Sequence, residues 1–290
     1  MEHRKNHLVN SMVSGNYEVF HINEIVEEHK TLYHLHDFYE IHITLNGNGI
    51  FYLDGSLYEL SAGSILLIHH GDLHRIVAQK SSQYERVYMF VTPEFLEHAS
   101  TENTNLLKCF TPTGSIRSKV LKADMKEVGP YIEPFMCSID KKNYGQDLIY
   151  EQAVVRFILF LNQLALREEN DVLNENDSSN ELIDTVMKYV NDHLKEDLSL
   201  ERVSSHFFIS KYYLSHKFKE ITDMTFHNFV LKKRLYYAKQ LLRKYHNASV
   251  VYNDCGFASY TYFLKSFKKE FSITPKQFVM LAKQGEKMRP

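Results

Sequence analysis

An ungapped internal repeat in the last third of the chain restricts the fold more than any other feature. Residues 210–230 align with residues 259–279 at a constant offset of 49 positions, and seven of the 21 aligned positions are identical. Two copies are too few to build a solenoid, which needs about three or more repeats to bury a continuous core. The repeat therefore predicts two equivalent units that act together on a periodic partner.

Each copy has the pattern of a helix with one apolar and one polar face. Ser210 and Ser259 stand where a helix begins, and a serine there accepts a hydrogen bond from an unpaired backbone N–H. Apolar residues four positions apart mark the buried face, and these are Leu214 with Phe218 and Phe263 with Phe267. The opposite face is polar, cationic and aromatic, which suits the major groove of duplex DNA. We predict DNA contacts from Ser210, Tyr212, Ser215, His216 and Lys219 in the first copy and from Ser259, Tyr260, Thr261, Leu264, Lys265 and Lys268 in the second.

The segments around the two copies predict further helices. A short amphipathic helix at about 200–207 precedes the first copy, and another ends at Gly256, where glycine can adopt the positive φ of a turn. A helix at about 225–245 joins the copies, and about 20 residues of helix span about 30 Å. Successive major-groove faces on one side of B-DNA lie roughly 34 Å apart. One rigid helix is therefore expected to hold two helix-turn-helix units one turn apart.

Charge is divided unevenly along the chain. Residues 1–179 contain 15 Lys+Arg and 25 Asp+Glu, whereas residues 180–290 contain 19 and 11. A basic C-terminal part is typical of a domain that meets a polyanion. The polar, acidic segment 169–180 predicts a linker, with Ser179 or Asn180 capping a helix that begins near Glu181.

Cysteine use and hydropathy exclude other classes of protein. The three cysteines are odd in number and too widely spaced for a disulfide framework or a zinc site. The charged start of the chain does not have the pattern of a signal peptide, and no run of about 18 apolar residues occurs. These features predict a cytoplasmic protein without membrane contact.

The C-terminal domain resembles the AraC/XylS transcription regulators. The resemblance rests on LSLERVSSHFFISKYYLSHKFKE at 198–220, RLYYAKQLL at 234–242 and GFASYTYFLKSFKKEFSITPKQF at 256–278. It implies a double helix-turn-helix DNA-binding domain in residues 181–290.

The chain departs from the family pattern at several places. Asp223 stands where the family usually has glycine, so the turn there is expected to be strained or differently shaped. The connection between Leu242 and Val251 is one residue short, and Tyr252 and Leu264 replace smaller residues. We therefore expect the first unit to read bases and the second mainly to hold the DNA backbone.

Residues 15–92 have the pattern of β-structure. Short runs rich in β-branched and aromatic residues alternate with turn signals such as Asn46-Gly47-Asn48-Gly49 and Asp54-Gly55. Closely spaced short strands predict a sandwich or a small barrel. Residues 1–110 are therefore expected to form one β domain.

Helical periodicity follows at 117–136 and 146–168. The second segment carries a broad apolar stripe, which either packs on the barrel or pairs with a second copy of the chain. We expect residues 111–168 to form a helical dimerisation segment.

Histidines in the β region resemble the two motifs of cupin barrels. The sequence HLHDFYEIHITLNG at 34–47 supplies His34, His36 and Glu40, and GSILLIHHGDLH at 63–74 supplies His74. In metal-binding cupins these positions are ligands, and three imidazoles with one carboxylate can bind Zn, Fe, Mn or Ni. The alternative is that the four residues line an effector pocket without a metal. His42 and His70 match neither motif and are interpreted as ordinary strand residues.

The sequence thus predicts two domains, an all-β cupin-like barrel followed by helices and an all-α tandem helix-turn-helix domain. The resemblance implies a homodimeric transcription regulator that binds double-stranded DNA and a small effector, most simply a sugar or related metabolite. Contact with RNA polymerase fits this assignment. No resident cofactor is expected apart from the divalent metal that the four residues could hold. The alternatives are a regulator that senses a metal or another non-sugar signal and a metal-cupin enzyme, although the sequence contains no nucleophile elbow or phosphate loop.

Overall fold

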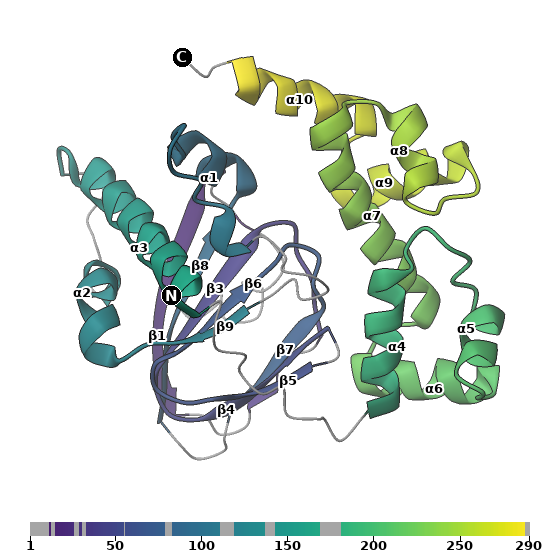
Figure 1. The fold of residues 1–290 in the computed structure, drawn as a ribbon, viewed down its shortest axis with the longest axis horizontal. Coiled ribbons are helices and arrows are strands. Elements are labelled where there is room, and N and C mark those ends of the chain that lie inside the picture. Colours follow the sequence, from purple (N-terminus) through teal and green to yellow (C-terminus); the bar gives the residue numbers. More distant parts are fainter. Residues whose placement is uncertain are drawn as a thin grey trace. The chain divides into compact units, whose positions relative to one another are not determined.

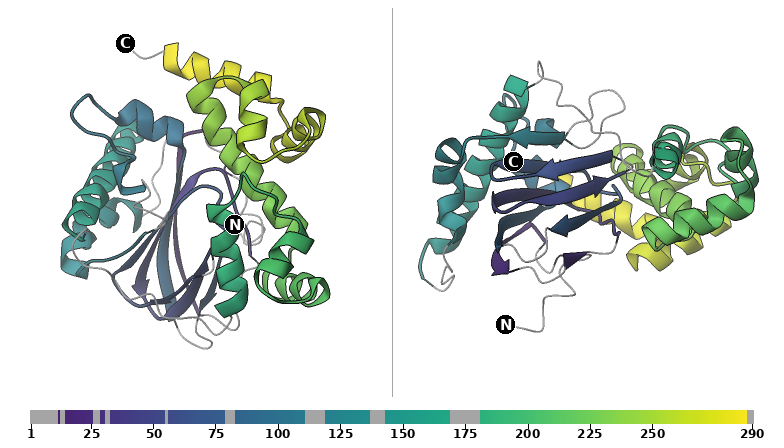
Figure 2. Two further views of the ribbon diagram at one scale, coloured as in Figure 1. Left: turned by 45° about the vertical axis from the view of Figure 1, so that its right-hand side comes forward. Right: turned by 90° about the horizontal axis from the view of Figure 1, so that it is seen from below.

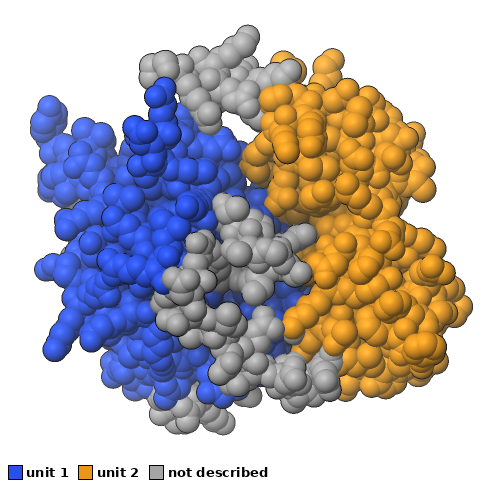
Figure 3. Space-filling view, in the orientation of Figure 1, with its two compact units in different colours: residues 1–176 blue, residues 177–290 orange. Residues whose placement is uncertain are grey.

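The computed structural model describes residues 12, 15–25, 29–30, 33–54, 56–78, 83–110, 119–136, 143–168 and 181–287. The chain divides into two compact units, Met1–Asn176 and Asp177–Pro290, which Figure 3 colours separately. The predicted linker at 169–180, with its capping residues Ser179 and Asn180, lies outside the described residues.

The first unit is built on two antiparallel sheets (Figure 1). Its strands are β1 (Tyr17–Ile25), β2 (His29–Lys30), β3 (Tyr39–Asn46), β4 (Gly49–Leu53), β5 (Ser56–Leu60), β6 (Ser64–Ile68), β7 (His74–Ala78), β8 (Gln83–Val91) and β9 (Lys119–Lys122). One sheet has the order β1-β8-β3-β6-β9 and the other β2-β7-β4-β5. Apolar side chains from both sheets share one interior, with Leu66 and Ile68 meeting Phe51 and Ile76. The strands therefore enclose a flattened barrel, as the sequence predicted.

Helices cover the outer face of the five-stranded sheet. They are α1 (Pro93–Ala99), the 3₁₀ turn η2 (Lys108–Phe110), α2 (Met125–Met136) and α3 (Gln146–Glu168). Alternation along β3 sends Ile41 and Ile43 outward to this face, where they join Phe157 and Leu161 of α3 in one core. Views in Figures 1 and 2 show α2 and α3 side by side. The apolar stripe of α3 thus packs on the barrel.

Two sequence interpretations were wrong in this unit. Residues 119–122, which lie within the predicted helix at 117–136, form strand β9 and pair with β6. Val120 faces the barrel interior while Leu121 faces the helices, and an alternation of only four residues is too short to separate from a helical period. His70 lies in the turn after β6 and not in a strand.

Helix α3 is long and apolar enough, by length and composition, to cross a membrane. Half of its apolar window is buried inside the structure, however. Val154, Phe157 and Ile158 belong to the core shared with the sheet. Packing within the unit therefore accounts for one apolar face of the helix.

The second unit is all-helical. Its helices are α4 (Glu181–Asp192), α5 (Leu200–His206), α6 (Lys211–Thr222), α7 (Phe226–Tyr245), α8 (Ala248–Asp254), α9 (Tyr260–Phe271) and α10 (Pro275–Lys287). Phe218 of α6 packs between Phe226 and Phe229 of α7. Phe263 and Phe267 of α9 pack in a second core with Leu235 of α7. The long helix therefore takes part in both helix-turn-helix units, as its position between the copies predicted.

The sequence repeat is also a repeat of backbone geometry. Ser210 and Ser259 cap α6 and α9, each accepting a hydrogen bond from a backbone N–H three residues later. Asp223 and Ser272, which correspond at the offset of 49, end these helices with positive φ values of 57° and 61°. The turn at Asp223 therefore keeps the shape that a glycine would give.

A left-handed conformation costs a residue with a side chain about 1 kcal/mol or more. We expect Asp223→Gly to raise the free energy of unfolding by about 0.5–1 kcal/mol, because relief of this strain exceeds the entropy gained by the unfolded chain. Urea unfolding of the full chain measures the change, and Ser272→Gly should act in the same direction. Glu220→Gly, inside α6, is the control and should destabilise by about 1 kcal/mol. Destabilisation by Asp223→Gly would contradict the argument.

The shortened connection between α7 and α8 is made by two capping residues in succession. His246 ends α7 with a φ of 55°, and Asn247 begins α8 by accepting a hydrogen bond from the N–H of Ser249. Tyr252 of α8 lies against Tyr260 at the start of α9, with ring centroids 5.3 Å apart. The larger residue thus packs on α9, where the family usually has a small one.

Candidate functional site

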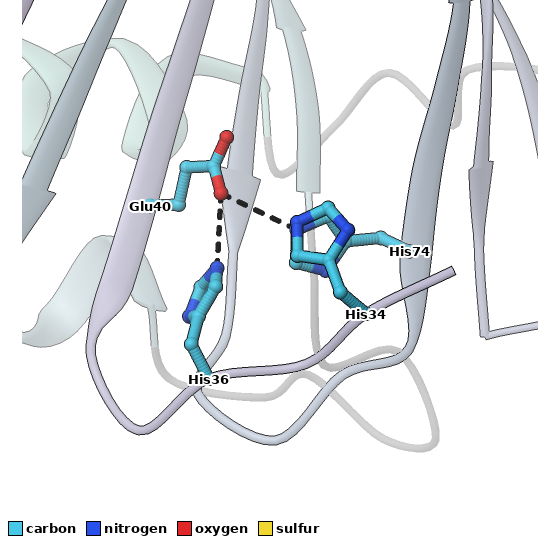
Figure 4. A group of neighbouring side chains, drawn as sticks. All are labelled: His34, His36, Glu40 and His74. Atoms are coloured by element: carbon cyan, nitrogen blue, oxygen red, sulfur yellow. Dashed lines mark hydrogen bonds and ion pairs between the residues drawn. The ribbon is translucent and has the colours of Figure 1, made fainter. Parts of the chain in front are cut away.

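Inside the barrel, the structure brings the four cupin-motif residues together (Figure 4). Glu40 extends inward from β3, His74 begins β7, and His34 and His36 lie on the segment before β3. Their potential ligand atoms all lie within 4.8 Å of one another. His36, Glu40 and His74 are buried, and His34 is half-buried. The isolated bridge between His34 and His74 joins the two segments at this point.

Backbone carbonyls fix the orientation of two imidazoles. Nδ1 of His36 lies 2.9 Å from the carbonyl of Phe38, and Nδ1 of His74 lies 2.8 Å from the carbonyl of Asp72. A carbonyl only accepts, so each Nδ1 carries a hydrogen. Nε2 of His36 and of His74 then both face the same oxygen of Glu40, at 2.9 and 3.3 Å.

This arrangement requires a positive charge among the side chains. A neutral ring with hydrogen on Nδ1 presents a lone pair at Nε2, and two such lone pairs facing a carboxylate oxygen repel it. Although burial opposes ionisation, the imidazoles of His36 and His74 that face its oxygen hold the pKa of Glu40 well below its ordinary value. Burial lowers the pKa of His36. Burial also acts to lower the pKa of His74, but the neighbouring carboxylate of Glu40 outweighs it and raises that pKa. A proton on His74 would satisfy one of these two contacts, whereas a divalent cation at this point would satisfy both, so the donor set fits a divalent metal.

A second group of polar side chains on the barrel interior was missed by the sequence analysis. Strand β8 turns Tyr84, Arg86 and Tyr88 inward, opposite His42 and Thr44 of β3. The guanidinium of Arg86 lies over both tyrosine rings, at 4.9 and 5.3 Å from their centroids. The only signal in the sequence was the short alternation of polar and apolar residues along 86–89, which matches no motif.

In the helical unit, the predicted contact residues of α6 lie on its exposed side. The side chain of Tyr212 is 73% exposed and stacks on His216, with centroids 3.9 Å apart. Nδ1 of His216 lies 3.0 Å from the carbonyl of Tyr212. Lys219 is exposed and Ser215 half-buried. The first copy therefore presents a preformed aromatic and polar surface.

The second copy presents a different surface. Thr261, Lys265 and Lys268 of α9 are exposed, whereas Leu264 is half-buried and packs against the core. Tyr260 is 39% exposed and lies against Tyr252. The surface of α9 is thus more cationic and less aromatic than that of α6.

Not every basic residue of the long helix is available to a polyanion. Lys233 and Lys239 of α7 are buried, and Lys239 lies 5.0 Å above the ring of Phe271. Phe208, which the sequence analysis did not single out, is 96% exposed in the turn before α6 with a φ of 54°.

Two family profiles match the chain. The AraC-like ligand binding domain matches residues 16–122, and a helix-turn-helix domain matches residues 203–280. The transcriptional activator RhaS of Escherichia fergusonii is 26% identical over 239 residues, which are 81% of this chain and 82% of that protein. The regulatory protein PocR of Salmonella typhimurium is 35% identical over 94 residues, 32% of this chain and 31% of that protein. A crystal structure of ToxT from Vibrio cholerae with an unsaturated fatty acid is 13% identical, with a TM-score of 0.41, covering 92% of this chain and 96% of that chain.

A ligand-binding β domain followed by a tandem helix-turn-helix domain defines a DNA-binding regulator that responds to a small molecule. The chain belongs to the AraC/XylS family of transcription regulators.

Proposed function

We propose that the exposed faces of α6 and α9 bind an operator and that a small metabolite inside the barrel, a sugar or a related compound, controls this binding. The observation that carries the proposal is the concentration of buried polar side chains on the barrel interior, where His36, Glu40, His42 and Arg86 are all nearly inaccessible to solvent. A metabolite can shift regulation only if it binds two arrangements of the protein with different affinity.

Footprinting on the DNA upstream of the chain's own gene and its neighbours, with and without a panel of sugars, tests this function. We expect protection of two sites about one helical turn apart and a change of protection with an active compound. Absence of protection under all conditions would refute DNA binding at these sites. Contact with RNA polymerase and a cytoplasmic location belong to the same proposal, since RhaS is a transcriptional activator.

We also propose that the outer face of α3 joins two copies of the chain. Leu148, Leu159 and Leu166 are 62%, 37% and 42% exposed. They are spaced by 11 and 7 residues, so they lie in one line along the helix. This line is opposite the residues that pack on the sheet, which leaves α3 apolar on two sides.

A charge in this line should separate the copies. We expect Leu159→Glu to convert a homodimer to a monomer, because a buried unpaired carboxylate costs several kcal/mol at an interface. Sedimentation velocity measures the mass. Gln163→Glu, which adds the same charge beside the line, should leave the dimer intact. A dimer that survives Leu159→Glu together with Leu166→Glu would place the interface elsewhere.

A second candidate function is metal sensing through His34, His36, Glu40 and His74. The fixed Nδ1 atoms of His36 and His74 favour it, because they aim both Nε2 atoms at one point beside Glu40. These four residues would hold the ion, and a bound divalent cation would neutralise Glu40 and link the two segments.

Elemental analysis of the purified full chain tests the metal. We expect about one zinc, iron, manganese or nickel ion per chain and at least a 10-fold loss of metal affinity in His34→Ala, since one ligand is removed. His98→Ala removes a histidine of α1 outside the cluster and serves as the matched control. Metal-free protein whose melting temperature is unchanged by added zinc would leave only the metabolite function.

A further inference from the structure

Two nitrogen atoms buried inside the barrel have no hydrogen-bond partner among the described residues. They are Nδ1 of His42 and Nη1 of Arg86, on side chains of residues that are 0% and 2% exposed. Burying such a group without a partner costs roughly 1–3 kcal/mol, and more for a charged one. Two of them side by side indicate a bound acceptor, either water or a ligand.

Both atoms belong to one region of the barrel wall. In the pairing of β3 with β8, His42 lies opposite Tyr88 and Thr44 lies opposite Arg86. The ring of His42 is 4.7 Å from that of Tyr88, and the guanidinium of Arg86 lies over the same tyrosine. The two unpaired groups thus share aromatic neighbours on the inner face of the sheet.

His42 offers a hydrogen at Nδ1. Its Nε2 lies 2.9 Å from the hydroxyl of Tyr84, which in turn lies 3.3 Å from the hydroxyl of Thr44. If Nε2 accepts, Tyr84 donates to it and Thr44 donates to Tyr84, so both hydroxyl hydrogens are used. The other tautomer leaves one hydroxyl hydrogen without an acceptor in this trio.

Arg86 offers a charged donor. Its Nε donates to the hydroxyl of Tyr88 and its Nη2 to Glu24, each at 2.7 Å. Burial lowers the pKa of Arg86, but Tyr88 and Glu24 outweigh burial and raise it, so the guanidinium stays protonated. Burial also raises the pKa of Tyr88 to about 12, so this hydroxyl is neutral. The hydrogens on Nη1 remain for a further acceptor.

We propose, on the basis of the proposed ligand-binding function of the barrel, that Arg86 and His42 bind a carboxylate group of the effector. Both unpaired groups are donors, and a carboxylate is a group that only accepts. A guanidinium with a carboxylate forms the stronger, charge-assisted type of hydrogen bond. A hydroxyl group of the effector would bring a hydrogen of its own, and the acceptors of His42, Thr44 and Tyr84 are already used. The effector is thus an organic acid, and a sugar acid combines this group with the hydroxyls of a sugar.

Calorimetric titration of the full chain with matched pairs tests the proposal. The probes are glucose with glucuronate, galactose with galacturonate, and glycerol with glycerate. We expect at least one acid to bind with millimolar or lower Kd and at least 10-fold more tightly than its neutral partner. Arg86→Gln should weaken the binding of that acid by about 10- to 100-fold, and His42→Phe should weaken it by about 5- to 10-fold.

Glu24→Gln is the matched control, because it removes the ion pair of Arg86 and leaves the guanidinium in place. This variant should bind the acid at least as tightly as the wild type. Three results would overturn the proposal. They are equal binding of an acid and its neutral partner, no binding of any acid at about 10 mM, and an unchanged affinity for the acid in the double variant His42→Phe with Arg86→Gln. Operator binding by the same preparations, measured without a probe, tests the regulator function separately. If the chain binds DNA and a neutral sugar, the regulator function stands and the proposal of a carboxylate effector is refuted.

Discussion

Replacing Tyr212, Ser215 and His216 together by alanine should reduce operator binding to the level of non-specific DNA. A side chain that contacts a base edge contributes about 1–3 kcal/mol of discrimination, so we expect about 10³-fold or greater loss for the triple variant. The stacking of Tyr212 on His216 means that the two rings are ordered before DNA is met. Their substitution therefore removes a preformed surface and not a mobile one.

Titration of the footprinted operator and of a scrambled duplex, at several salt concentrations, measures this effect. We expect the triple variant to lose affinity for the operator alone, while Lys265→Ala and Lys268→Ala weaken both duplexes and each reduces the salt slope by about one. Tyr245→Ala removes an exposed tyrosine at the end of α7 and is the control. Unchanged operator affinity in the triple variant would show that α6 does not read bases.

The helical unit could be predicted from sequence in detail because its signals are local. Serine caps and the apolar spacing of four act within one or two turns of helix, and the offset of 49 repeats both signals in the second copy. Asp223 shows the limit of this reasoning, since its substitution for glycine predicted a turn that is either strained or differently shaped, without deciding between the two. The structure keeps the turn and places the aspartate in the left-handed conformation instead.

The polar interior of the barrel could be predicted only where a motif existed. His34, His36, Glu40 and His74 stand in two recognisable segments, and the structure brings all four together. Arg86 has no motif, and its place opposite Thr44 depends on strand register, which is set by pairing between segments far apart in the chain. Strand β9 was misassigned for the same reason, because its pairing with β6 is what makes it a strand.

Gly256 lies in the turn between α8 and α9, and we expect even its replacement by alanine to destabilise the helical unit strongly. Its φ is +77°, and a Cβ built there would lie 2.3 Å from the carbonyl oxygen of Leu194 and 2.9 Å from the guanidinium of Arg234. Arg234 of α7 donates to that same carbonyl, at 3.0 Å, and to the carbonyl of Glu196, at 2.5 Å. A backbone oxygen held in this way cannot give room to a methyl group.

We therefore expect Gly256→Ala to lower the free energy of unfolding by about 3 kcal/mol or more, from backbone strain and the clash together. Urea unfolding of the full chain gives the magnitude, and hydrogen exchange should place the loss of protection within 181–281. Gly15→Ala is the control: this glycine lies outside the left-handed region, and the space that a methyl group would take there is open, so alanine should change the free energy of unfolding by less than about 0.5 kcal/mol. Arg234→Met keeps the glycine but removes both hydrogen bonds to the segment after α4. If Gly256→Ala proves neutral while Arg234→Met destabilises, the guanidinium alone holds the two helix-turn-helix units in register, and the close approach of Gly256 to Leu194 is not required.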